Sequence, residues 1–210
     1  MLQPLIALLY AGTQQSAHFS AASSGMFLLI IAIGIAGYIV QARLQSVFKK
    51  YSKVQFPGGL TGAQVAEKML RENNIHNVKV THVAGHLTDH FNPQTMTVNL
   101  SDSVYNSTSV AAAAVAAHEC GHAVQHARDY APLTLRSQLV PVVQFASSAA
   151  TWVILLGLVL LATTRNELVC WIGVALIAMS ALFSLITLPV EYNASARALE
   201  WLESSRTLQG

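Results

Sequence analysis

Charged residues are scarce in this chain of 210 residues, where they make up 10% of the sequence. A soluble globular domain usually carries about 25% charged residues. Because 53% of the residues are hydrophobic, we do not expect a soluble cytosolic protein. The 12 basic and 10 acidic residues leave a formal net charge of only +2, which is too little for a surface that binds phosphate groups. Nucleic acid is therefore excluded as a partner.

Cysteine is almost absent from the chain. The two cysteines, Cys120 and Cys170, form neither a CxxC pair nor the spaced framework that cross-links small secreted domains. The sequence therefore predicts neither a disulfide scaffold nor a redox site.

Three stretches contain no Lys, Arg, Asp or Glu over roughly the 20 residues that a helix needs to cross a bilayer. A charge at the centre of such a helix would cost about 2.5 kcal/mol or more, so its absence favours membrane spans over buried core helices. We predict transmembrane helices at 21–40, 145–162 and 168–190. Residues 1–20 are expected to form an N-terminal leader that is partly interfacial.

The distribution of basic residues predicts the topology. Nine of the 12 basic residues lie between Arg43 and Arg136. The positive-inside rule then places residues 41–140 in the cytoplasm of an integral plasma (inner) membrane protein. The second and third spans are separated by so few residues that they must form an antiparallel hairpin. The C-terminal segment 191–210 therefore returns to the cytoplasmic side.

Residues 41–140 suffice for one small domain with helices and strands. Thr61 can cap a helix that ends near 73–74, and alternating apolar and polar residues predict strands at 78–83 and 95–100, in a hairpin or a small sheet. The strand 95–100 could offer an edge to an extended peptide. The alanine-rich segment 110–127 predicts a helix.

The helix 110–127 belongs to the soluble domain, since its histidines and its glutamate would not be tolerated against lipid. The predicted fold class is therefore a mainly α membrane protein, with about three transmembrane helices and a small α+β domain between the first and the second.

This helix carries the motif HExxH, in which His118 and His122 are separated by one helical turn. Residues four apart lie on one face of a helix, so both imidazoles can bind the same zinc ion. Glu119 reaches the same cleft and can take a proton from a zinc-activated water. We therefore predict a Zn²⁺ site with Glu119 as the general base. The alternative is a helix with ordinary histidines that bind no metal.

A catalytic zinc needs a third protein ligand. The histidine that would follow in some HExxH enzymes is excluded, because that position is Arg128, and His126 lies about 12 Å along the helix from His118. Glu191 is the better candidate, because it follows the third span on the side where the domain lies. The alternative is that Glu191 only pairs with Arg197.

A second group of polar residues, His82, His86, Asp89 and His90, lies between the predicted strands. A spacing of four residues places side chains on the same face only in a helix, and no helix is predicted here. We interpret them as polar loop residues near the cleft, with a second metal site or hydrogen bonding to a transition state as alternatives. His126 is expected beside the site or on its substrate side, or as an ordinary surface histidine.

Five stretches of this sequence carry a resemblance to other proteins: 60–63, 85–90, 116–123, 130–133 with 135–137, and 188–195. Through them the chain resembles a known family, the bacterial membrane-anchored neutral zinc metallopeptidases of the YugP-like type. The resemblance implies a zincin-like domain with His118, His122 and Glu191 as zinc ligands and Glu119 as base. The wider pattern of such sites has an acidic residue four positions after the ligand glutamate, whereas this chain has Ser195 there. Asn193 and Asp89 are then candidates to orient His118.

The predicted function is that of a membrane-anchored zinc endopeptidase that hydrolyses peptide bonds in a protein or peptide substrate. One alternative is a non-catalytic membrane module in which a structural zinc joins the soluble domain to the third span. A closed site with four ligands would distinguish it from a catalytic site, which keeps one position open. A protease with its metal inside the bilayer is less consistent with the sequence, because HExxH does not lie within an apolar span.

Overall fold

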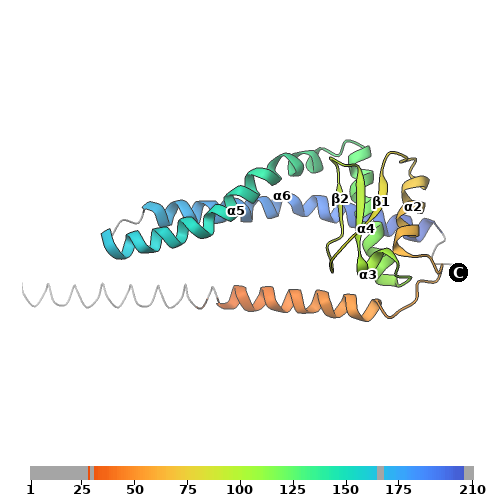
Figure 1. Cartoon of the computed structure of the whole chain (residues 1–210), viewed down its shortest axis with the longest axis horizontal. Helices are drawn as coiled ribbons and strands as arrows, with labels where there is room; N and C mark the ends of the chain where they lie inside the picture. Colours follow the sequence, from red (N-terminus) through yellow and green to blue (C-terminus); the bar gives the residue numbers. More distant parts are fainter. Residues whose placement is uncertain (1–27, 29–30, 165–167, 206–210) are drawn as a thin grey trace, which may run out of the picture. The chain divides into compact units, whose positions relative to one another are not determined.

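The structure is a computed structural model that describes residues 28, 31–164 and 168–205 (Figure 1). The chain divides into two units, Met1–Lys50 and Tyr51–Gly210. A helix over Ile31–Tyr51, which ends at the boundary between the two units, is long and apolar enough to cross a membrane, and it continues well beyond the predicted span 21–40. The predicted leader 1–20 and the start of that span lie outside the described residues.

Within the second unit, α2 (Gly62–Glu72) has its start fixed by a capping box. The Gln64 backbone N–H donates to Thr61 Oγ1 at 3.2 Å, and the Thr61 N–H donates to the Gln64 side chain at 2.9 Å. The helix ends at the C-cap Asn73. Both ends therefore confirm the helix that was predicted from Thr61.

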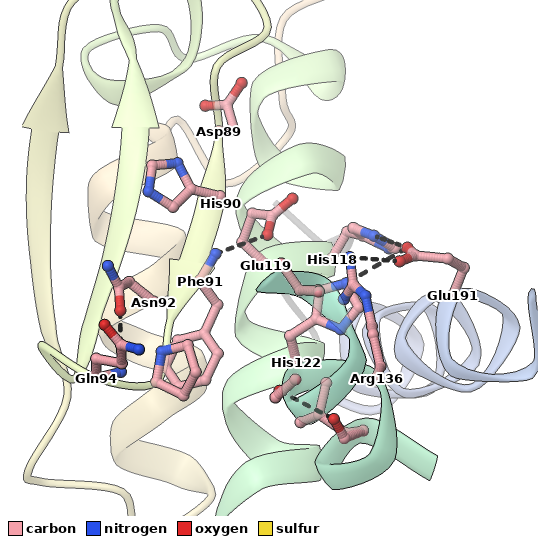
Figure 2. A pocket seen from close by; sticks show the side chains of 14 residues that line it. Asp89, His90, Phe91, Asn92, Gln94, His118, Glu119, His122, Arg136 and Glu191 are labelled. Atoms are coloured by element: carbon pink, nitrogen blue, oxygen red, sulfur yellow. Dashed lines mark hydrogen bonds and ion pairs between the residues drawn. The ribbon is translucent and has the colours of Figure 1, made fainter. Parts of the chain in front are cut away.

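Three strands form one sheet in the order β1-β3-β2: β1 (Lys79–Val83), β2 (His90–Asn92) and β3 (Thr97–Ser101). β1 pairs with β3 in parallel, and β2 pairs with β3 antiparallel. The prediction that residues 95–100 offer an edge to a peptide is wrong, because β3 is the central strand and both its sides are paired. The strand at the edge beside α4 is β2 (Figure 2).

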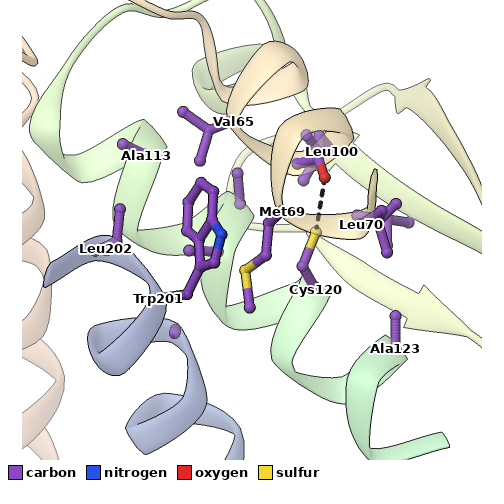
Figure 3. Packing of buried hydrophobic residues seen from close by; sticks show 14 of the residues in the cluster. Val65, Met69, Leu70, Leu100, Ala113, Cys120, Ala123, Trp201 and Leu202 are labelled. Atoms are coloured by element: carbon purple, nitrogen blue, oxygen red, sulfur yellow. Dashed lines mark hydrogen bonds between the residues drawn. The ribbon is translucent and has the colours of Figure 1, made fainter. Parts of the chain in front are cut away.

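The short helix α3 (Asp102–Tyr105) leads to α4 (Val110–Ala127), where Ser109 accepts a hydrogen bond from the Ala112 N–H at 3.2 Å. The small alanine side chains let α2 and α6 pack closely on α4. Met69 of α2 and Trp201 of α6 meet in the buried core over this helix (Figure 3). The C-terminal part of α6 is therefore part of the domain's core.

The two remaining helices, α5 (Ala131–Thr164) and α6 (Leu168–Ser204), run side by side (Figure 1). They extend beyond the predicted spans 145–162 and 168–190 into the domain, and each contains a proline, Pro141 or Pro189. Both helices are long and apolar enough to cross a membrane. The predicted class is thus confirmed: over its described residues the chain is mainly α, with three candidate membrane-spanning helices and a small sheet between the first and the second.

Candidate metal centre

α4 presents the two histidines of HExxH on one face, as the helical spacing predicted. The rings of His118 and His122 lie 4.9 Å apart between centroids. His122 is buried, with 5% of its surface exposed, and His118 is half-buried. Their Nε2 atoms point toward α6 (Figure 2).

α6 brings Glu191 to the two histidines. Its Oε2 lies 3.3 Å from His118 Nε2 and 3.4 Å from His122 Nε2. The ligand atoms of these three residues lie within 4.8 Å of one another, a group that could hold a metal ion. The sequence predicted this residue from the course of the chain alone, since 69 residues separate it from His122.

Gly121 explains why α6 can come so close to α4. A side chain at this position would collide with the backbone of Ala194, which lies one helical turn after the ligand-bearing part of α6. The glycine inside HExxH therefore serves the approach of the second helix, which places Glu191 opposite the histidines.

Gln125, which is fully buried, fixes the tautomer of His122. Its Nε2 donates to the Val190 carbonyl at 2.8 Å, and a carbonyl can only accept. The amide oxygen therefore faces His122 Nδ1, 3.0 Å away, which must carry the proton. In the neutral ring this leaves the lone pair of Nε2 directed at Glu191. Gln125 was not predicted as a site residue, although its position three residues after His122 places it near that ring on the helix.

His118 is held by Ser195, whose Oγ lies 3.1 Å from His118 Nδ1. The expectation that Asn193 or Asp89 orients this ring is wrong. Asn193 accepts instead from Gln125 Nε2 at 3.0 Å. The Asp89 carboxylate accepts from the backbone and side chain of Ser101 at 2.7 and 2.9 Å. Ser195 lies one turn after Glu191, so it reaches the same face of α6.

The other oxygen of Glu191 is paired with Arg136 of α5, whose Nη2 lies 3.2 Å from Oε1. The alternative pair of Glu191 with Arg197 is not formed, because Arg197 Nε donates to Asn193 at 2.8 Å. The two oxygens of Glu191 therefore have different partners, one for the arginine and one for the histidines. The position of Arg136 in the sequence did not predict its ion pair with Glu191.

Glu119 lies beside this group and lines the same cavity of about 480 Å³. Its Oε2 accepts a hydrogen bond from the Phe91 N–H of β2 at 3.0 Å. Burial raises the pKa of Glu119, while the two neighbouring histidines oppose this shift. The carboxylate is thus oriented by the edge strand, and its burial disfavours the charged form.

The remaining polar residues have separate surroundings. Asp89 and His90 line the cavity, as expected of polar residues near the cleft. His82 contacts Asp102 at 2.6 Å, away from the histidines of α4. The His126 ring lies 5.7 Å from Phe91 between centroids. Among the described residues, only His118, His122 and Glu191 form a group with metal-binding geometry.

The three residues fit zinc by the chemistry of their donors. Two imidazole nitrogens and one carboxylate oxygen are the ligand set of several catalytic zinc sites. Each ring also has a hydrogen-bond partner on Nδ1, the nitrogen remote from Glu191. Such partners hold metal-binding imidazoles in the required orientation.

A family model described as "Putative neutral zinc metallopeptidase" matches residues 26–210. The chain belongs to this family. It is 42% identical over 179 residues to the "Putative membrane protease YugP" of Bacillus subtilis (strain 168), across 85% of this chain and 77% of that relative. No solved structure matches the chain. The match confirms the resemblance to the YugP-like family, and it includes α4, α5 and α6 with all of the residues described above.

Proposed function

We propose that the protein is a membrane-anchored zinc endopeptidase in which His118, His122 and Glu191 hold the metal and Glu119 is the general base. The observation that carries the proposal is the meeting of three donor atoms from α4 and α6 beside the half-buried carboxylate of Glu119, in one cavity. The family of the chain supports zinc as the metal.

When bound, zinc supplies a Lewis acid that polarises a carbonyl and lowers the pKa of water. Glu119 takes a proton from the attacking water and passes it to the leaving amine. The Phe91 N–H holds one oxygen of Glu119, so the other oxygen is available for the proton. Arg136 holds Glu191 through Oε1, so that Oε2, which faces the two histidines, would hold the metal.

The substrate is an extended peptide that lies along β2. This strand is at the edge of the sheet, and its residues 90–92 line the cavity opposite the histidines. An edge strand binds a peptide through main-chain hydrogen bonds, which need no particular sequence. Because the Phe91 N–H donates to Glu119, the peptide pairs with the remaining main-chain groups at this edge. β2 replaces the strand 95–100, which is paired on both sides.

The alternative function is a structural zinc that joins the domain to α6. A structural site would need a fourth protein ligand. Among the described residues the group has three members, which matches the open site of a catalytic zinc. The three candidate spans and the basic residues of 41–140 support an integral plasma membrane protein with the site on the cytoplasmic side.

The test is to compare Glu119→Gln with the wild type on unfolded casein. We expect the variant to retain zinc and to lose about 10²–10⁴ in rate, because the general base is gone while the ligands remain. Glu67→Gln is the matched control, since Glu67 is an exposed glutamate on α2. Near wild-type turnover in Glu119→Gln would remove this residue from the mechanism.

A further inference from the structure

The cavity of the candidate metal centre is bounded on one side by the two long helices. Leu133, Arg136, Ser137 and Val140 of α5 and Glu191 of α6 line it. These residues lie at or next to the ends of the segments without charged side chains, which are 137–164 of α5 and 168–190 of α6. The wall of the cavity is therefore continuous with the helices that are apolar enough to cross a membrane.

The depth of the site follows from helix geometry on α6. Residues 168–190 contain no charged side chain, and at about 1.5 Å per residue they span about 35 Å, close to the roughly 30 Å of a hydrocarbon core. With one membrane surface at the start of α6, the other crosses this helix about 20 residues later, near Leu188. Glu191 then lies only about 5 Å beyond the hydrocarbon.

α5 gives a second count from the same end of the helix pair. No charged residue occurs in 137–164, and the same length measured back from Thr164 places the surface near Gln144. Val140, at the rim of the cavity, is about 6 Å outside it. Apolar side chains stay exposed across this level: Val140 is 40% exposed, Val142 55% and Phe145 77%. Both helices therefore place the cavity at the depth of the lipid headgroups, which extend about 5–8 Å from the hydrocarbon.

We propose that the substrates are membrane-inserted proteins, cut in the extended segment that leaves the bilayer. This inference rests on the proposed function and names its substrate class. A segment that emerges from the membrane passes the headgroup layer directly and reaches β2 and Glu119 without leaving it. A folded soluble protein would have to insert a segment into the headgroup layer to reach this level.

The test uses the full chain in nanodiscs of phosphatidylethanolamine and phosphatidylglycerol. The substrate is a single-span protein in the same discs, with a tail that carries two identical casein-derived segments. The first segment follows the span directly, and a proline-rich spacer of about 20 residues holds the second about 60 Å further out. Mass spectrometry gives the initial rate of cutting in each segment. The same tail without the span is the matched control.

We expect the first segment of the anchored substrate to be cut at least ten times faster than the second, and the two segments of the free tail to be cut equally. Equal cutting in the anchored substrate, or faster cutting of the outer segment, would overturn the substrate class and leave the peptidase activity standing. If the zinc-loaded protein cuts neither tail nor unfolded casein, the proposed function fails, and the substrate class fails with it.

Discussion

Gln125→Leu tests whether the buried amide, and not only the HExxH motif, decides how His122 meets the metal. Leucine has a similar volume, so it fills the space without offering a hydrogen bond. The substitution leaves the His122 Nδ1–H without its partner in a site where 5% of the residue is exposed. An unsatisfied buried donor costs about 1–3 kcal/mol.

Without the Gln125 amide, the His122 ring is also no longer held in one orientation. Gln125 donates to the Val190 carbonyl and to Asn193, so the same side chain ties α4 to the turn of α6 that carries Glu191. Substitution of a residue that orients a metal-binding histidine typically costs 10–100-fold in metal affinity. We therefore expect Gln125→Leu to weaken zinc binding by about that factor.

Competition with a chromogenic chelator in detergent measures this affinity directly. Leu100→Ala is the matched control, because Leu100 is fully buried in the domain core, outside the metal centre, and its truncation costs a comparable or larger 2–5 kcal/mol. The control should lower thermal stability and keep the zinc affinity of the folded protein. Wild-type affinity in Gln125→Leu would refute the role of the amide.

Two further predictions concern helix packing and topology. Gly121→Ala should destabilise the protein by about 1–3 kcal/mol and lower its zinc content, because the added Cβ meets the Ala194 backbone; Gly34→Ala, with nothing within 4 Å, should do neither in the same thermal unfolding and metal assays. A tag at Arg165 should be accessible from outside intact cells and one at Gly59 should not, and the reverse labelling would contradict the cytoplasmic site.

Local signals predicted much of the fold. The capping residue Thr61, the alternation in 78–83 and the alanine-rich segment 110–127 each specify one element through its own residues. The pairing of the strands was not predictable in this way, because alternation assigns a face and says nothing about neighbours. β2 has only three residues, too few for a periodic pattern, although it lies at the edge beside Glu119.

The residues of the candidate site likewise fall into those that the sequence predicted and those that it did not. HExxH is a spacing within one helix, and the return of the chain across the membrane predicted that Glu191 would lie nearby. Gln125, Ser195 and Arg136 act through contacts between α4, α5 and α6, which depend on how closely these helices approach. No local pattern contains that information.

The zinc content of Glu191→Ala tests the central claim most directly, because Glu191 is the proposed ligand that lies furthest from the motif. Glu200→Ala is the matched control, since Glu200 is an exposed glutamate on the same helix. Metal analysis of the purified full chain should give one zinc per chain for the wild type and for Glu200→Ala, and less than about a tenth of that for Glu191→Ala, as for His122→Ala. Full zinc retention in Glu191→Ala would contradict the account.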